Sequence, residues 1–199
     1  MSREFVNRSV ANDAENLYNK KQLKRSAANQ RKRHSRKNDA GYCLDLVNQK
    51  KENNPMLKNI PPILSPEMLK VLCEMGHSDR LVIGDANFPA QSMGKNCIVL
   101  RADGHSATDL LDAILTVFPL DTYVEKPVNL MQVMPGDTVE TPIWDEYKAI
   151  IAKHDERGAE TVGEIERFEF YRQTKECYAI IATGEKALYA NVMLQKGVI

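Results

Sequence analysis

The sequence predicts an α/β protein, in which a single layered α/β/α domain follows a basic extension. Short apolar runs typical of buried strands alternate with stretches whose apolar residues recur at helical spacing. A chain of 199 residues is long enough for one medium domain with its own core. The charge changes near Pro55, since residues 1–55 hold 13 Lys and Arg against 6 Asp and Glu, whereas residues 56–199 hold 14 against 21. We therefore divide the chain into an extension, residues 1–55, and a domain, residues 56–199.

The extension is rich in Lys, Arg, Asn and Ser and poor in large apolar side chains. Such a composition buries too little apolar surface to offset the entropy of an ordered chain, so we predict a disordered tail. Its basic runs at residues 20–25 and 31–37 could contact nucleic acid or another polyanion. No aromatic stacking pattern is interleaved with those charges, so we favour a solvated tail and expect no nucleic-acid partner.

The domain opens with a helix that begins at Pro66. Ser65 can cap its free N–H groups, Pro66 suits the first helical position, and Gly76 suits the C-terminal cap. The apolar run Leu81–Ile83, bounded by polar and turn-forming residues, predicts a short buried strand. The elements expected next are a loop at 86–96, a strand at Cys97–Leu100, and a helix from the Ser106 cap to Phe118.

The second half of the domain continues the alternation. The elements expected in order are a strand at Asn129–Met134, a turn at Pro135–Asp137, a helix capped by Thr141 and ending near His154, a short helix within Glu164–Lys175, and strands at Tyr178–Ala182 and Tyr189–Leu194. A turn separates the last two strands, so we predict that they form a hairpin.

Composition and motifs exclude several classes of function. The four cysteines are widely spaced and form no Cys/His cluster, so we expect no metal site and a reducing, cytoplasmic location. No run approaches the roughly 20 apolar residues of a membrane span. The patterns GxGxxG, GxxxxGK[ST], HExxH and GxSxG do not occur in the sequence, so nothing supports a nucleotide cofactor, P-loop hydrolysis or a serine nucleophile.

A histidine and a carboxylate flank the first predicted strand. His77 precedes it and Asp85 follows it, and a strand extended over residues 79–85 would span roughly 20 Å. The two side chains could then share a pocket only if the chain folds back or a second subunit completes the site. His77 also has a structural interpretation of equal weight, because it could bond the last carbonyl groups of the preceding helix.

The remaining polar candidates are Arg167 and the cluster Tyr189–Asn191. Each has an alternative interpretation: Arg167 could pair with a neighbouring glutamate, Glu164 or Glu166, and Tyr189 could be a strand residue on a core face. The residues taken alone predict only a polar pocket.

From Met56 to the C-terminus, a series of short motifs occurs in a fixed order. They are Met56–Lys58, Leu64–Glu67, Glu74–His77, Asp85–Pro89, Arg101–Gly104, Arg167–Phe168, Thr183–Glu185, Tyr189–Asn191 and Lys196–Val198. With these motifs the chain resembles the family of L-fucose mutarotase and D-ribose pyranase. Three of these motifs are similar to those of the fucose branch of the family: Phe88–Pro89, Arg101–Gly104 and Arg167–Phe168.

The resemblance implies a compact α/β subunit in a ring-based homodecamer, with a monosaccharide bound between neighbouring subunits and no cofactor. It implies that His77 is catalytic and that the sugar is bound by Asp85, Arg167, Tyr189, Ala190 and Asn191. One departure is Gln91, which stands where fucose-type relatives often have a histidine. The segment His154–Thr161 also looks altered.

The function expected from this resemblance is mutarotation, which opens the cyclic sugar at its anomeric carbon and recloses it on the other face. One group takes the proton of the anomeric hydroxyl while another donates a proton to the ring oxygen, and a histidine suits such proton transfer. Two alternatives remain open: a monosaccharide-binding module without catalysis, and a polyanion-binding protein that acts through the basic extension.

Overall fold

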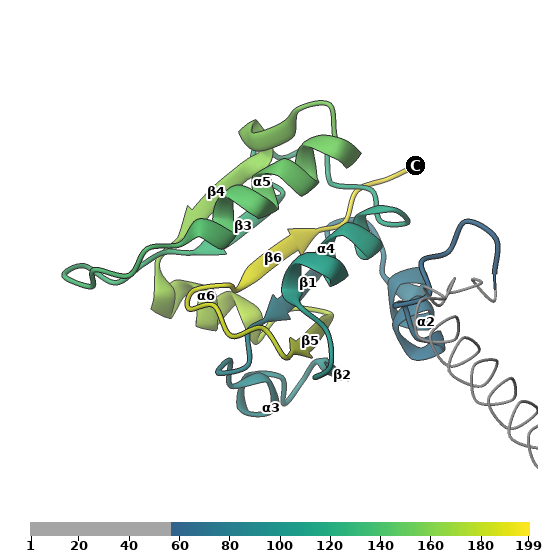
Figure 1. Cartoon of the computed structure of the whole chain (residues 1–199). Coiled ribbons are helices and arrows are strands. Elements are labelled where there is room, and N and C mark those ends of the chain that lie inside the picture. The colour runs from purple at the N-terminus through teal and green to yellow at the C-terminus, as the bar shows by residue number, and fades with distance from the viewer. Residues whose placement is uncertain (1–56) are drawn as a thin grey trace, which may run out of the picture. The chain divides into compact units, whose positions relative to one another are not determined.

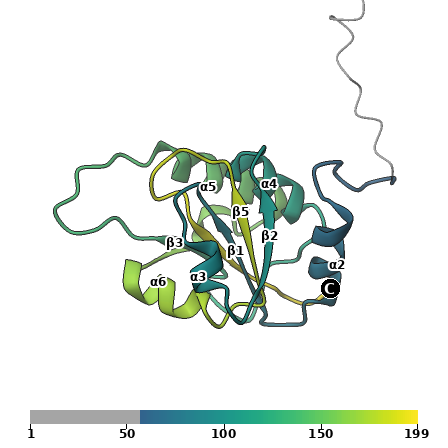
Figure 2. The ribbon, with the colours of Figure 1, turned by 90° about the horizontal axis from the view of Figure 1, so that it is seen from below.

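The computed structural model describes residues 57–199, so the predictions for the extension lie outside the described residues. A six-stranded sheet runs through the domain, with helices packed on both of its faces (Figures 1 and 2). This arrangement confirms the predicted α/β/α layering. In sheet order the strands are β2 (Ile98–Ala102), β5 (Ala179–Thr183), β1 (Arg80–Gly84), β6 (Val192–Gln195), β3 (Val128–Met131) and β4 (Val162–Ile165).

The sheet is mixed, because β6 runs antiparallel to both of its neighbours, β1 and β3, while the other pairs are parallel. The predicted hairpin of the last two strands is therefore wrong, since β1 lies between β5 and β6. β1 has three completely buried side chains, Leu81, Val82 and Ile83, so both of its faces must be covered by other parts of the protein. A strand in the centre of the sheet is covered in this way. The connection 184–191 easily crosses the roughly 10 Å of two strand spacings.

Two apolar clusters hold the layers together. The first joins one face of the sheet to α2 (Pro66–Glu74), α4 (Ala107–Leu115) and α5 (Pro142–His154), and the second joins the other face to α3 (Ala90–Met93) and α6 (Arg167–Thr174). Leu81 and Ile83 belong to the first cluster and Val82 to the second, because successive side chains of a strand point to opposite faces. Figure 2 shows α4 and α5 on one side of the sheet and α3 and α6 on the other.

The starts of the helices agree with the predictions from the sequence better than their ends do. Ser65 Oγ accepts a hydrogen bond from the backbone N–H of Met68 at 3.2 Å, and Ser106 Oγ accepts one from Asp109 at 3.1 Å. Thr141 makes no side-chain cap, and α5 begins with Pro142 instead.

The C-terminus of α2 differs from the prediction for Gly76. The helix ends at Glu74 with Met75 as its cap, and the left-handed backbone falls on Ser78, whose φ is 70°. Lys196 supplies the missing cap, because its ammonium donates to the carbonyl of Leu72 at 2.9 Å and also to that of Met75.

Two elements, β4 and α3, were not predicted from the sequence. The edge strand β4 has the sequence Val-Gly-Glu-Ile, which carries too few apolar residues to resemble a strand, and it pairs with β3 alone. α3 is one turn long, which is too short for helical periodicity to register, and it lies in the predicted loop 86–96. A 3₁₀ turn at Gly158–Thr161 precedes β4.

Candidate functional site

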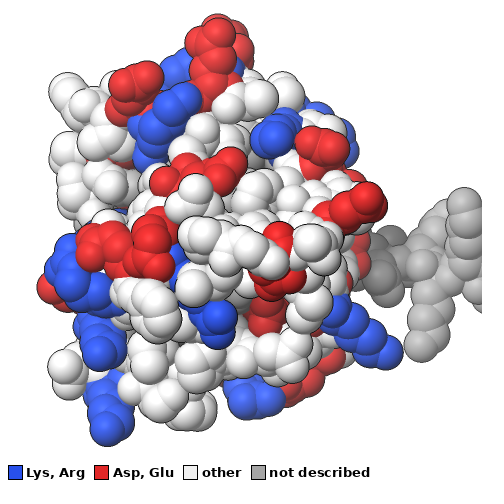
Figure 3. Space-filling view, turned by 90° about the vertical axis from the view of Figure 1, so that its left-hand side faces the viewer, with Lys and Arg blue, Asp and Glu red and all other residues white. Residues whose placement is uncertain are grey.

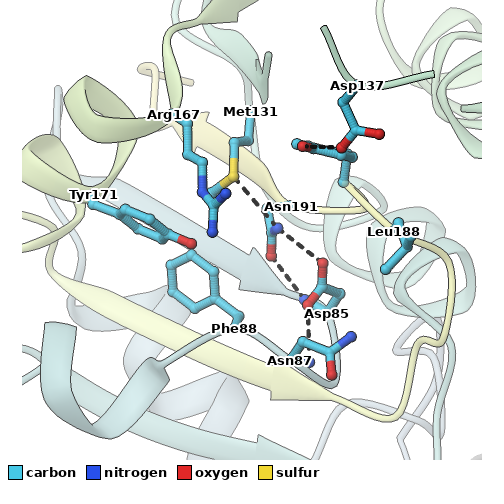
Figure 4. Close-up of a pocket in the computed structure, with 10 residues that line it drawn as sticks. Asp85, Asn87, Phe88, Met131, Asp137, Arg167, Tyr171, Leu188 and Asn191 are labelled. Atoms are coloured by element: carbon cyan, nitrogen blue, oxygen red, sulfur yellow. Dashed lines mark hydrogen bonds between the residues drawn. The ribbon is translucent and has the colours of Figure 1, made fainter. Parts of the chain in front are cut away.

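A pocket opens where β1 and β3 end and β6 begins (Figure 4). β1 and β3 are both antiparallel to β6, so their carboxyl ends meet at one edge of the sheet, which is where α/β proteins bind ligands. The cavity measures about 230 Å³. Its lining consists of Asp85, Asn87, Phe88, Met131, Asp137, Arg167, Tyr171, Leu188, Tyr189 and Asn191.

The floor of the pocket is a buried pair, Asp85 and Asn191. Asn191 Nδ2 donates to Asp85 Oδ2 at 2.9 Å, and the backbone N–H of Asp85 donates to Asn191 Oδ1 at 2.9 Å. The N–H of Asn87 donates to Asp85 Oδ1 at 2.9 Å. Burial raises the pKa of the Asp85 carboxyl, and these hydrogen bonds oppose that rise. The carboxyl group is therefore fixed in position and faces the cavity as a hydrogen-bonding group.

Arg167 opens α6 and points into the same cavity (Figure 4). Its guanidinium lies over the Tyr171 ring, 5.7 Å from the centroid, and its Nε is buried without a hydrogen-bond partner among the described residues. The expected alternative, a pair with a neighbouring glutamate, does not form: Glu166 instead caps α6 by accepting from the N–H of Phe168 at 2.9 Å. Arg167 thus retains donors for a ligand.

Tyr189 lies before β6, so it is not the strand residue of the alternative interpretation, although its partly buried side chain does pack against the second apolar cluster. Its φ of 55° is strained for a bulky residue, and such strain is often found at functional sites. The carbonyl of Tyr189 accepts from the indole of Trp144 at 2.9 Å. Its hydroxyl donates to Asp137 Oδ2 at 2.8 Å, and this bond raises the pKa of Tyr189. The segment 132–141, which extends from the body in Figures 1 and 2, thereby contributes Asp137 to the pocket.

Ala190 is completely buried and its side chain does not line the pocket. Its carbonyl accepts a hydrogen bond from the Tyr147 hydroxyl at 2.8 Å. Because Tyr147 is itself buried in α5, this bond fixes the backbone between Tyr189 and Asn191. The structure places Ala190 as a support for its two neighbours.

His77 lies outside this pocket, before the start of β1. Its Nε2 is 3.3 Å from Asp121 Oδ2, and its ring lies 5.3 Å from that of Tyr123. The imidazole is 43% exposed. The structural alternative for His77 is not realised, since Lys196 occupies the helix carbonyl groups that it would have capped. One chain therefore carries two separate groups, the polar pocket at one end of β1 and the histidine at the other.

Several pocket residues were not named as candidates from the sequence. Asn87 and Phe88 lie inside the motif that supplied Asp85, and Tyr171 follows Arg167 by four residues on one helix, so spacing could have found them. Asp137 sits on a turn that is remote in sequence from the rest and gave no signal. Gln91 lies beside the pocket, in a neighbouring depression that also includes Asp85.

The chemistry of the pocket suits a small polyhydroxylated ligand. It offers a carboxyl group, a guanidinium, a carboxamide and a phenol, with aromatic rings as apolar walls.

Within residues 57–199 no group of three His, Cys, Asp or Glu side chains could hold a metal ion. No helix in that range is long and apolar enough to cross a membrane. On the face shown in Figure 3, basic and acidic side chains are intermixed, with no patch of one sign.

Comparisons with known proteins agree with the family resemblance of the sequence. A model of the RbsD / FucU transport protein family matches residues 58–199. The fucose mutarotase of Mus musculus is 46% identical over 145 residues, which cover 71% of this chain and 94% of that protein. The structure of FucU from Bifidobacterium longum matches with a TM-score of 0.71 and 64% identity, over 71% of this chain and 99% of that one. The fucose mutarotase of Streptococcus pneumoniae, solved in complex with L-fucose, matches with a TM-score of 0.67 and 43% identity, over 72% and 99% of the two chains.

Proposed function

Because the chain belongs to the RbsD / FucU family, we propose that it is an L-fucose mutarotase, an isomerase that interconverts the α- and β-anomers of the sugar. The relatives named fucose mutarotase and the L-fucose complex of one of them support the choice of substrate. The observation that carries the proposal is the pocket itself. Four polar residues from distant parts of the chain meet around one cavity of about 230 Å³: Asp85, Arg167, Tyr189 and Asn191.

The pocket residues have distinct roles in this proposal. Asp85, held by Asn191 and the N–H of Asn87, accepts hydrogen bonds from sugar hydroxyl groups. Arg167 donates to sugar oxygens with nitrogen atoms that have no carboxylate partner among the described residues. Tyr189, oriented by Asp137, closes the side of the cavity next to the segment 132–141. Together these groups hold the ring while its anomeric bond opens.

Proton transfer is assigned to His77, which requires a second copy of the chain. His77 and the pocket are at opposite ends of β1, so His77 of one copy would enter the pocket of the next. Contact between two unlike patches is heterologous, and repeated around an axis it closes a ring, which fits the homodecamer that the family resemblance implies. Exposed aromatic and apolar side chains lie beside the two patches and suit such a contact: Tyr123 near His77, Leu188 at the pocket, and Phe168 next to Arg167 in sequence. The free thiols of Cys73, Cys97 and Cys177 suit a reducing compartment, and we place the protein in the cytoplasm.

The experiment is an anomer-exchange assay. The full chain is added to L-fucose, and the rate of α/β exchange is followed by saturation-transfer NMR. We expect acceleration by the parent protein and by His154→Ala, since His154 pairs with Asp112 away from the pocket, and a loss on the order of 10²–10⁴-fold in His77→Ala. Sugar binding without faster exchange would instead identify a binding module. Salt-sensitive nucleic-acid binding that disappears when residues 1–55 are deleted would identify a polyanion binder.

Mixing two impaired variants tests the shared site. Co-expressed His77→Ala and Arg167→Met chains, carrying different tags and purified through both, would form mixed rings. In these, about a quarter of the sites would combine an intact pocket with an intact histidine from the neighbouring copy. At L-fucose concentrations well below the raised dissociation constant of Arg167→Met, exchange in the mixture should therefore exceed that of either variant alone several-fold. Tagged mixed rings without any recovery would contradict the two-copy site.

A further inference from the structure

Tyr189 holds a backbone conformation that a tyrosine rarely adopts. Its φ of 55° lies in the left-handed region, where the Cβ of a bulky residue crowds the backbone. A glycine would occupy this conformation without that penalty. The residue lies near the end of the connection 184–191, and Asn191 of the pocket follows two positions later. Other groups of the protein must therefore stabilise the backbone that carries both side chains into the pocket.

Helix α5 supplies two of the stabilising contacts. The indole N–H of Trp144 donates to the carbonyl of Tyr189 at 2.9 Å. The hydroxyl of Tyr147 donates to the next carbonyl of the chain, that of Ala190, at 2.8 Å. Trp144 and Tyr147 are three residues apart, so they lie on one face of the helix. One turn of α5 thus holds two successive carbonyl groups of the segment that leads into β6.

The two donors are themselves held by the core. Tyr147 is completely buried, and Trp144 packs against the first apolar cluster. Burial raises the pKa of Tyr147, so its hydroxyl keeps its proton and donates at neutral pH. Ala190 is also completely buried, and a buried carbonyl that loses its donor is costly. The two hydrogen bonds therefore connect a rigid helix to the backbone of the pocket.

The chain that leads into α5 holds the other end of Tyr189. The Tyr189 hydroxyl donates to Asp137 Oδ2 at 2.8 Å and accepts from the N–H of Met134 at 3.4 Å. Both partners belong to the segment 132–141, which runs directly into Pro142, the first residue of α5. One continuous stretch of chain therefore bonds Tyr189 at its hydroxyl and at its carbonyl.

We propose that Trp144 and Tyr147 are positioning residues, which hold the backbone before β6 so that the pocket side chains of that segment meet the sugar. This inference rests on the proposed function. Neither residue lines the pocket, so both act through the segment that they hold. Interactions that position a binding group support the bound sugar and the transition state alike, and their loss raises KM while kcat is unchanged. A residue needed only for folding would instead reduce the amount of active protein and leave KM unchanged.

The hydrogen bond from Trp144 should also respond to the sugar, because coupling between two equilibria is reciprocal. If this bond strengthens sugar binding by some factor, bound sugar strengthens the bond by the same factor. A hydrogen bond between neutral groups contributes a factor of about 3–10 to an equilibrium constant. Bound L-fucose should therefore slow the exchange of the indole proton with water by about 3- to 10-fold.

The kinetic test uses Tyr147→Phe, which removes one hydroxyl and keeps the ring. Its matched control is Tyr178→Phe, because Tyr178 packs against the same apolar cluster and does not line the pocket. The variants are assayed as full chains by α/β exchange over a range of L-fucose concentrations. We expect Tyr147→Phe, and likewise Trp144→Phe, to raise KM about 3- to 10-fold with kcat within about twofold. Tyr178→Phe should match the parent protein in both constants. An unchanged KM in both α5 variants, or a lower kcat at constant KM, would overturn the inference.

The indole proton is measured in the parent protein, which keeps the test valid if the variants do not fold. Trp144 is the one tryptophan of the chain, so ¹⁵N-labelled protein gives a single indole signal by NMR. Exchange of its proton with water is followed without sugar and with saturating L-fucose. A rate that bound sugar leaves unchanged would contradict the positioning role. A parent protein that binds L-fucose without accelerating α/β exchange would refute the proposed mutarotase, whereas slower exchange of the indole proton would still support the role of α5.

Discussion

Replacing Arg167 by methionine should weaken sugar binding strongly and change stability little. The substitution removes a charged donor from the pocket, and a hydrogen bond to a charged group contributes about 1.5–3 kcal/mol. At about 1.4 kcal/mol per factor of ten, the dissociation constant for L-fucose should rise about 10- to 150-fold. The folded state loses only the stacking on Tyr171, about 0.5–1 kcal/mol, because Arg167 forms no ion pair within the described residues. Methionine retains the apolar stem of the side chain and removes the buried, unpartnered Nε.

Two measurements decide this prediction. The dissociation constant comes from titrating L-fucose against the fluorescence of Trp144, the one tryptophan of the chain, whose indole donates to the carbonyl of Tyr189 at the pocket. The free energy of unfolding comes from urea denaturation. The matched control is Arg172→Met on the same helix, because Arg172 is exposed, pairs with Glu169 and Glu176, and does not line the pocket. Equal dissociation constants for Arg167→Met and the parent, or a loss of stability well above 1 kcal/mol, would refute the reasoning.

Two further predictions concern the backbone around the pocket and the surface of α6. A Cβ at Gly184 would overlap the carbonyl oxygen of Asp103, so Gly184→Ala should lower the free energy of unfolding, measured by urea denaturation, by about 1–3 kcal/mol. The control is Gly104→Ala, whose Cβ meets open space and which should change that free energy by less than about 0.5 kcal/mol. Equal free energies of unfolding for the two variants would contradict the close approach at Gly184. Hydrogen bonds from Arg172 lower the pKa of Glu169 from 4.5 to about 2, so the ionised carboxylate stabilises the fold above pH 4.5, and that contribution disappears as the pH falls towards 2. Glu169→Gln should therefore be slightly less stable than the parent at pH 7, and a difference that does not shrink between pH 4.5 and 2 would exclude this origin.

The fold was predictable where local chemistry decides it. The caps Ser65 and Ser106 act within their own helices, and the apolar run of β1 is buried whatever its partners are. Strand order depends instead on which edges meet in three dimensions, and the insertion of β1 between β5 and β6 leaves no local signal. The cap of α2 is the clearest case, because the group that satisfies it, Lys196, comes from the other end of the chain.

The site was predictable in its members more than in its geometry. The motifs around Asp85, Arg167 and Tyr189–Asn191 supplied four residues that line one cavity. Asp137 and Asp121 were missed, because each acts on a side chain remote in sequence, Tyr189 and His77 respectively. A carboxylate in a turn resembles any solvated residue until the fold places its partner beside it.

The length and burial of β1 explain why His77 and the pocket remain apart within one chain. β1 is paired along its length with β5 and β6, and its three central side chains are completely buried. Folding it back would break hydrogen bonds on both edges, each contributing about 0.5–1.5 kcal/mol, and would expose apolar side chains at about 1.5–3 kcal/mol each. That total is comparable with the whole stability of a domain, about 5–15 kcal/mol, so a conformational change cannot bring His77 to its own pocket. A catalytic role for His77 therefore requires the pocket of a neighbouring copy, and the buried central strand makes assembly a condition of the proposed activity.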